Sequence, residues 1–199
     1  MSKSDQPLLF ALTSPSMGSG KSEVARYLVA RYGFQWIKLA ETLKGMTRVL
    51  LEAYGVSTRD ISKMLEGELK EATLPELGGA TPRRIMQTLG TEWGKQEIHP
   101  SIWVNIAMKQ AHEQRLRGRP VVIDDLRFPD EMVAIKEAGG LVINVVRPGA
   151  AVTSDHSSEG ALAGYRKDWT LHNSGPLQDL RRSVDRLMTV LAAPPPANP

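Results

Sequence analysis

Short apolar runs alternate with helical patterns near the start of the chain. Residues 8–14 (LLFALTS) form a continuous apolar run, and a glycine-rich turn follows it. Apolar residues then recur at helical spacing from Val24 to Tyr32, and Gly33 follows the last of them. This order predicts a strand, a loop and a helix. Residues 34–40 (FQWIKLA) are interpreted as a second strand.

The same alternation returns after a long middle section. Residues 120–125 (PVVIDD) and 141–146 (LVINVV) are typical of buried parallel strands, and 128–140 (FPDEMVAIKEAGG) between them indicates a helix. Residues 168–173 (DWTLHN) are interpreted as a last strand, and an amphipathic helix follows from Leu177. We therefore predict an α/β fold with a parallel sheet of about five strands and helices on both faces.

The middle section, 41–118, is predicted to be almost entirely helical, with glycines separating its helices. Thr81 and Pro82 have the residue types of an N-cap and a first helical position. A second helix is expected after Pro100. Ligands of parallel sheets bind at the carboxyl ends of the strands, so the site is expected there.

Length and composition narrow the class of protein. The 199 residues fit one domain, expected over 1–193, with a disordered tail at 194–199 (PPPANP). Cysteine is absent, which excludes thiol nucleophiles and favours a reducing, cytoplasmic location. The N-terminal apolar run of five residues is too short for a signal peptide or a membrane span, so no membrane association is expected.

Charge argues against a nucleic-acid partner. The chain has 25 basic and 22 acidic residues, with both signs interspersed. One local cluster, Arg115, Arg117 and Arg119, is interpreted as a solvated helix end because no aromatic residues lie among the arginines.

The strongest chemical signal is the glycine-rich turn, residues 14–22 (SPSMGSGKS). A phosphate-binding loop needs successive inward N–H groups, small residues and a helix N-terminus beneath them. Pro15 stands where the strict motif has glycine, so the entrance of the loop is expected to differ. Lys21 is expected to reach the β and γ phosphates of ATP and the Ser22 hydroxyl to bind Mg²⁺. The predicted ATP-binding residues of the loop are Met17, Gly18, Ser19, Gly20, Lys21 and Ser22.

Two adjacent acids, Asp124 and Asp125, end the strand at 120–125. A carboxylate at this edge of the sheet is suited to holding Mg²⁺ or orienting an acceptor hydroxyl. Capping of the following turn is the alternative role. Spacing alone does not choose between the two acids.

Basic and aromatic residues mark the helix after Thr81. Arg83 and Arg84 lie in its first turn, where the helix dipole disfavours cations unless an anion is shared. A phosphate is such an anion, and a solvated helix face is the equally weighted alternative. Gln87 is a candidate for contacting a base edge, and Trp93 or Trp103 for stacking on one. For both tryptophans, packing in the core is the favoured reading.

Five segments together resemble the phage-type deoxynucleoside monophosphate kinases, relatives of adenylate kinase among the P-loop kinases. They cover most of the chain in the expected order: 18–22 (GSGKS), 81–104, 124–131 (DDLRFPDE), 156–159 (HSSE) and 173–180 (NSGPLQDL). The resemblance implies a P-loop kinase fold in which 41–118 binds the acceptor and 148–167 forms a lid. It implies Mg²⁺ as cofactor, and ATP and a deoxynucleoside monophosphate as substrates.

The resemblance also implies roles for single residues. It points to Asp125, Arg127 and Glu131 in the 124–131 segment, with Asp125 beside Ser22 at the metal and Glu131 on the acceptor. Asn173 is implied near the adenine of ATP. Arg147, which ends a buried strand, suits charge stabilisation of the transferring phosphoryl group. The lid residues implied are His156, Glu159 and Arg166.

Three functions are therefore compared. The first is transfer of the γ-phosphoryl group of ATP to a deoxynucleoside monophosphate, in the cytoplasm of a host cell if the chain is phage-encoded. The second is a kinase of another small acceptor such as dephospho-coenzyme A. The third is a P-loop ATPase or switch acting on nucleic acid or protein, for which hydrolysis is the output. A homodimer is compatible with all three.

Overall fold

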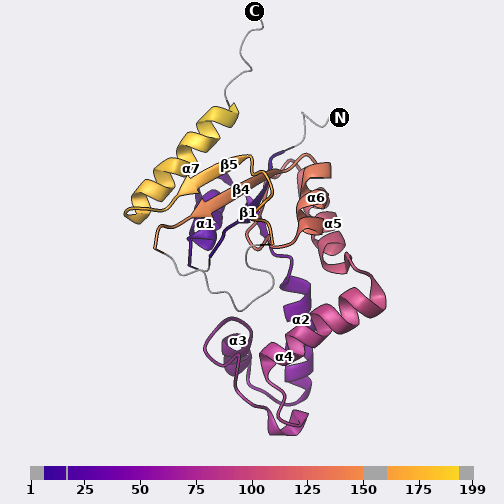
Figure 1. Cartoon of the computed structure of the whole chain (residues 1–199). Coiled ribbons are helices and arrows are strands. Elements are labelled where there is room, and N and C mark those ends of the chain that lie inside the picture. The colour runs from indigo at the N-terminus through magenta and orange to yellow at the C-terminus, as the bar shows by residue number, and fades with distance from the viewer. Residues whose placement is uncertain (1–6, 17, 150–160, 193–199) are drawn as a thin grey trace, which may run out of the picture. The chain divides into compact units, whose positions relative to one another are not determined.

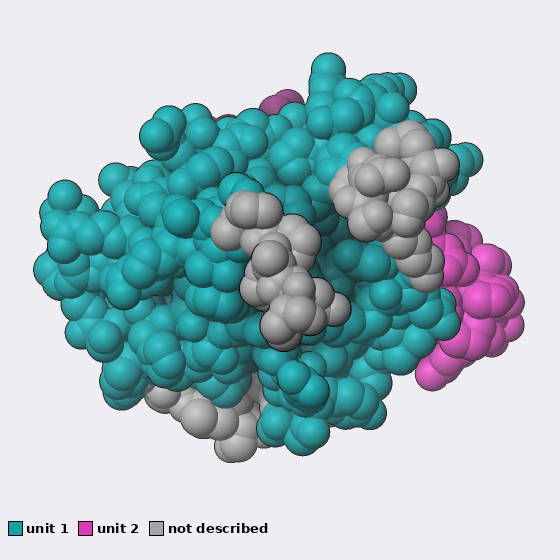
Figure 2. Space-filling view, turned by 90° about the horizontal axis from the view of Figure 1, so that it is seen from above, with its two compact units in different colours: residues 1–38, 108–199 teal, residues 39–107 magenta. Residues whose placement is uncertain are grey.

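The computed structural model describes residues 7–16, 18–149 and 161–192. The chain divides into two compact units, shown in different colours in Figure 2. Unit 1 comprises residues 1–38 and 108–199, and unit 2 comprises 39–107.

A parallel sheet forms the centre of unit 1 (Figure 1). Its strand order is β2-β3-β1-β4-β5, and each neighbouring pair is parallel. Every residue of β1 and β3 and half of β4 are buried, which explains the predominance of apolar residues in these strands. The predicted sheet is confirmed, although β2 is shorter than the segment 34–40 suggested. The strands are β1 (Leu9–Thr13), β2 (Gln35–Ile37), β3 (Val121–Ile123), β4 (Leu141–Val146) and β5 (Trp169–His172).

Helices cover both faces of this sheet (Figure 1). Side chains alternate along β1, so Phe10 and Leu12 share a face, where they pack in a core with α1 (Lys21–Tyr32) and α7 (Leu177–Ala192). Leu9 points to the other face, next to Ile135 of α6 (Pro129–Glu137), as their shared proximity to Gly140 shows. The carboxyl ends of all the strands meet at one edge, where the phosphate loop follows β1.

The end of α5 (Ile102–Leu116) corrects one expectation. Arg115 is buried rather than solvated: its Nε donates to the Pro7 carbonyl at 2.7 Å and its Nη1 to the Ala138 carbonyl at 2.9 Å. Burial lowers the pKa of this guanidinium from its usual value. The arginine joins the start of the chain to the end of α6, which sequence spacing does not reveal.

Unit 2 is helical, as predicted, and has its own core. Leu51, Ile61, Met64, Leu65 and Leu74 are buried together, with neighbouring apolar side chains packed around them. None of the helices in the described part of the chain has the length and apolar character needed to cross a membrane. Besides the first turns of α5, the helices are α2 (Glu41–Ala53), α3 (Thr58–Glu66), η2 (Pro75–Leu77), α4 (Pro82–Gln87) and η3 (Thr88–Ile98).

The helix expected after Thr81 begins as predicted. The Thr81 hydroxyl accepts a hydrogen bond from the Arg84 N–H at 3.2 Å, and Pro82 occupies the first helical position. From Thr88 to Ile98 the helix widens into a π-helix, η3. A π-helix of this length is rare, and such helices are often found at functional sites.

Candidate active site

The turn between β1 and α1 has the backbone of a phosphate-binding loop. Gly18 and Gly20 have φ angles of 68° and 105°, in the region that favours glycine. A Cβ atom on Gly20 would lie 2.7 Å from Nδ2 of Asn173 and 3.2 Å from Cδ2 of Leu180. The loop therefore needs glycine at this position for both reasons. Met17 lies outside the described residues.

Asn173 fixes the loop to the end of β5. Its Nδ2 donates to the Ser19 carbonyl at 2.9 Å, and its backbone N–H donates to the Val146 carbonyl at 2.7 Å. The Ser19 hydroxyl is buried and hydrogen-bonds to none of the described residues. Asn173 thus supports the loop directly. Its predicted place near the adenine stays a prediction.

Lys21 lies at the start of α1, and its ammonium group contacts the entrance of the loop. Nζ donates a hydrogen bond to Oγ of Ser14, which in turn donates to the Ser16 carbonyl at 2.8 Å. The Ser14 bond spans Pro15, the residue that departs from the strict motif. Sequence reasoning missed Ser14, because a serine at the end of a strand carries no signal of its own.

Asp124 stands between the loop and β2. Its Oδ2 accepts a hydrogen bond from the Ser22 hydroxyl at 2.9 Å, and its Oδ1 accepts one from Nε1 of Trp36 at 2.8 Å. Asp124 is only 7% exposed, so both oxygens obtain partners in place of water. The structure thus brings Asp124 to Ser22. Asp125, the acid that the resemblance favours, is half-buried, and its metal role stays a prediction.

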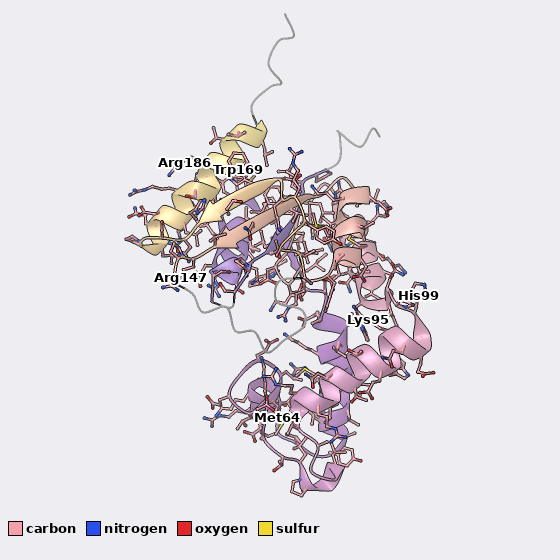
Figure 3. All side chains as sticks on the ribbon, viewed as in Figure 1. Met64, Lys95, His99, Arg147, Trp169 and Arg186 are labelled. Atoms are coloured by element: carbon pink, nitrogen blue, oxygen red, sulfur yellow. The ribbon has the colours of Figure 1, made fainter. Side chains whose placement is uncertain are left out.

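A cavity of about 430 Å³ opens over the loop. Arg147, which follows β4, lines it, with Nη1 3.5 Å from the Gly18 carbonyl. Figure 3 shows Arg147 at the loop end of the strands. The position suits a guanidinium that contacts bound phosphates. The other lining residues are Gly18, Ser19, Gly20, Lys21, Ser22, Glu23, Asn173, Gly175 and Leu177.

Two predicted site residues, Arg127 and Glu131, follow Asp125 and differ in burial. Arg127 is exposed. Glu131 is buried, and its Oε2 accepts hydrogen bonds from the backbone N–H groups of Arg127 at 2.8 Å and Phe128 at 3.0 Å. These bonds cap the start of α6. Glu131 therefore has a structural role here, and its predicted contact with the acceptor stays a prediction.

In unit 2, the two arginines of α4 differ in their surroundings. Nε of Arg83 forms an ion pair with Oε1 of Glu71. Arg84 is exposed, and no carboxylate of the described residues lies within ion-pair distance of it. Gln87, also exposed, lies three residues later on the same helix face. Arg84 is thus the more available of the two for an external anion.

The two predicted stacking residues are also different. Trp103 is buried, its Nε1 donates to the Gly90 carbonyl at 2.8 Å, and its ring lies so close to Gly94 that a Cβ there would come within 2.5 Å of it. Trp93 is 39% exposed, with its ring centroid 6.5 Å from that of Trp103. Packing therefore supports a core role for Trp103, whereas Trp93 retains exposed ring surface.

Most of the predicted lid, including His156 and Glu159, lies outside the described residues. Arg166 is exposed. Next to it, Nζ of Lys167 donates to the Leu162 carbonyl, and desolvation lowers the pKa of this lysine. The roles of the lid residues stay predictions.

The sheet order, the loop after β1 and the lysine and serine that begin α1 together define a P-loop kinase. The family model described as deoxynucleotide monophosphate kinase matches residues 69–184, more than half of the chain. The chain therefore belongs to the deoxynucleotide monophosphate kinase family, and the predicted family and enzyme class are confirmed.

Similarity to individual proteins agrees with this assignment. A protein of Acanthamoeba polyphaga mimivirus, provisionally named a deoxynucleotide monophosphate kinase, is 32% identical over 84% of this chain and 89% of its own length. The deoxynucleotide monophosphate kinase of Enterobacteria phage T4 is 30% identical, over 55% of this chain and 46% of the phage protein. The crystal structure of TT1252 from Thermus thermophilus has a TM-score of 0.52 at 20% identity, and covers 95% of this chain and 100% of that one. This last likeness concerns the fold alone.

Proposed function

We propose that this protein transfers the γ-phosphoryl group of ATP to a deoxynucleoside monophosphate and so forms the diphosphate. One observation carries the proposal: Lys21, Ser22 and Asp124 converge beside a cavity at the carboxyl end of a parallel sheet. The family to which the chain belongs supplies the acceptor class.

The loop residues are arranged to hold the phosphates of ATP. Glycines at 18 and 20 let the backbone N–H groups approach the phosphate oxygens, and the N-terminus of α1 favours the negative charge. Lys21 is expected to exchange its bond with Ser14 for the β and γ phosphates. Arg147, which lines the same cavity, is expected to stabilise charge on the transferring group.

The donor set at this edge fits Mg²⁺. Ser22 and Asp124 offer hard oxygen atoms 2.9 Å apart, and magnesium prefers oxygen ligands. Within the described residues there is no cluster of three or more acidic, histidine or cysteine side chains. That agrees with an ion held chiefly by substrate phosphates and water, which neutralises phosphate charge when it is bound. Here we assign Asp124, and Asp125 stays the alternative that the resemblance implies.

The acceptor is proposed to bind to unit 2 through Arg84. A guanidinium binds a monophosphate by paired, charge-assisted hydrogen bonds, and Arg83 is already paired with Glu71. Gln87, one turn later, is placed to contact a base edge, and Trp93 has ring surface available for stacking. Arg127 and the lid residues His156, Glu159 and Arg166 are carried over from the resemblance.

An assay of ADP release with a panel of acceptors tests the proposed function. The panel contains each deoxynucleoside and ribonucleoside monophosphate, dephospho-coenzyme A, and no acceptor. We expect rapid ADP formation with one or more deoxynucleoside monophosphates and slow formation without any acceptor. ADP formation that does not depend on an acceptor would instead indicate an ATPase. ADP formation only with dephospho-coenzyme A would show that the acceptor is not a nucleoside monophosphate.

A further inference from the structure

The two oxygens of the Asp124 carboxylate face two different donors. Oδ2 accepts from the Ser22 hydroxyl at 2.9 Å and Oδ1 from the indole Nε1 of Trp36 at 2.8 Å. An ionised carboxylate donates nothing, so the proton in each bond belongs to the serine or to the indole. The three side chains thus form one chain of hydrogen bonds that runs from β2, through the end of β3, to the start of α1.

Trp36 is held firmly enough to fix its partner. It lies in the middle of β2, opposite Val122 of β3 in the parallel register. Its ring packs against the core of unit 1, and Nζ of Lys38 lies 4.8 Å from the ring centroid. The indole N–H can only donate, so Asp124 is the acceptor in this bond.

The orientation of Asp124 decides how Ser22 presents itself. Because the Ser22 hydroxyl donates to Asp124, its oxygen lone pairs point elsewhere, and Ser22 lines the cavity over the loop. If the carboxylate of Asp124 turned away from Ser22, the Ser22 hydroxyl would no longer be held in this orientation. A residue such as Trp36, which holds a metal ligand without contacting the ion, commonly changes metal affinity by about 10-fold to 100-fold.

We propose that Trp36 is a positioning residue for the metal site of this enzyme. Its indole N–H fixes the carboxylate of Asp124, and Asp124 in turn orients the Ser22 hydroxyl toward a divalent cation bound with the nucleotide. This inference rests on the proposed function for the identity of the site, and it adds a residue that neither the loop motif nor spacing along the chain indicates.

The test replaces the indole N–H and keeps an aromatic ring. Trp36→Phe retains ring surface for the core and for Lys38 but removes the donor. Trp169→Phe is the matched control: Trp169 also packs at the edge of the same core, at the start of β5, and Figure 3 shows it at the end of the strands away from Arg147. Both variants lose a similar amount of apolar surface.

The affinity for Mn²⁺ is measured in the presence of saturating ADP. Binding is detected as a decrease in the electron paramagnetic resonance signal of free Mn²⁺. We expect Trp36→Phe to weaken Mn²⁺ binding by about 10-fold, and Trp169→Phe to leave it within about twofold. The affinity for ADP without metal should be similar in both variants and in the wild-type protein. Unchanged Mn²⁺ affinity in folded Trp36→Phe overturns the proposal.

A second measurement covers the case in which Trp36→Phe fails to fold. In ¹⁵N-labelled wild-type protein, the Trp36 indole resonance should shift when Mg²⁺ is added to the ADP complex, and the Trp169 resonance should not. Equal shifts, or no shift at either position, contradict the proposal. Neither experiment uses a nucleoside monophosphate. A metal effect without kinase activity would therefore disprove only the proposed function.

Discussion

At the scale of single residues, Lys21 is the side chain proposed to bring positive charge to the phosphates of ATP. Its ammonium group is hydrogen-bonded to Ser14 at the entrance of the loop, so the side chain is already directed along the loop. Phosphoryl transfer depends on positioning and on stabilising the charge of the transferring group rather than on a covalent nucleophile. Loss of one such charge is therefore expected to affect the rate far more than the fold.

The first prediction is that Lys21→Met lowers kcat/KM for ATP by about 100-fold to 1,000-fold. Steady-state kinetics with ATP varied measures the change, and circular dichroism confirms that the variant is folded. Lys136→Met is the control, because Lys136 is ion-paired with Asp168 on the surface of unit 1 and should tolerate the same substitution. A near-normal kcat/KM in folded Lys21→Met would show that the phosphate-loop assignment is wrong.

At the scale of elements, the junction between the loop and α1 depends on a glycine. Gly20 combines a φ of 105° with close approach to Asn173 and Leu180. We predict that Gly20→Ala lowers the free energy of unfolding by about 1 to 3 kcal/mol, through backbone strain and displacement of Asn173. It should also weaken ATP binding, because the Asn173 bond to the Ser19 carbonyl is disturbed.

Gly33→Ala separates these two effects. Gly33 ends α1 with a φ of 70°, and a Cβ there would have no neighbour within 4 Å among the described residues. Gly33→Ala should lower the free energy of unfolding by about 1 kcal/mol and leave ATP affinity unchanged. Urea unfolding and calorimetric titration with ATP measure both quantities. Equal ATP affinity in the two variants would show that the loop tolerates the clash.

Three side chains join α1 to α7. The hydroxyl groups of Tyr27 and Tyr32 both donate to Asp185, at 2.9 Å and 2.7 Å. Burial and the hydrogen bond to Asp185 raise the pKa of Tyr32 to about 12, and the hydrogen bond and burial raise the pKa of Tyr27. These bonds hold the C-terminal half of α1 against α7, while the N-terminal turn of α1 follows the phosphate loop.

The raised pKa predicts how this contact responds to pH. A tyrosine whose folded-state pKa lies above its unfolded value stabilises the fold fully below the unfolded pKa, near 10, and loses that contribution as pH rises to about 12. Tyr32→Phe should therefore cost roughly 1 kcal/mol at pH 8, and the difference from wild type should shrink between pH 10 and 12. Urea unfolding across that range measures it, with exposed Tyr54→Phe as the control. A difference that is constant with pH contradicts the assignment.

Sequence reasoning predicted the elements that depend on local pattern. The strands β1, β3 and β4 consist almost entirely of apolar residues, and the cap at Thr81 needs only neighbouring residues. Lys21 and Ser22 were likewise predicted, because the geometry of a phosphate loop is set within a few consecutive residues.

The remaining features depend on partners that are distant in sequence. Trp36 contacts Asp124, 88 positions later, and Arg115 bonds to Pro7, 108 positions earlier. Nothing in the local pattern of either residue indicates its partner. Glu131, by contrast, has a local partner: three residues after Phe128, its carboxylate accepts a hydrogen bond from the Phe128 N–H and caps α6, while its contact with the acceptor stays a prediction.

At the scale of the whole molecule, the two units contain different parts of the proposed reaction. The loop, Asp124 and Arg147 belong to unit 1, and α4 with its arginines belongs to unit 2. Each unit has a separate core, so substitutions on the surface of one should leave the folding of the other unchanged. ATP and the acceptor are therefore expected to respond to different substitutions.

The last prediction uses the difference between neighbouring arginines. Arg84→Ala should cost about 2 kcal/mol in kcat/KM for the acceptor, which is roughly a 30-fold loss, because charge-assisted hydrogen bonds to the monophosphate disappear. Arg83→Ala removes an exposed ion pair with Glu71 and should cost no more than about 1 kcal/mol. Neither should change ATP affinity, which depends on Lys21.

Steady-state kinetics of both variants, with each substrate varied in turn, distinguishes these outcomes. Selective loss for the acceptor in Arg84→Ala places the monophosphate at the start of α4. The reverse order of effects would assign the phosphate to Arg83 and require its pair with Glu71 to break when the acceptor binds. If neither variant loses acceptor efficiency, or if both lose ATP affinity equally, the acceptor phosphate binds elsewhere. Removing a guanidinium that contacts this phosphate must reduce the stabilisation of the transition state, and so must lower kcat/KM for the acceptor.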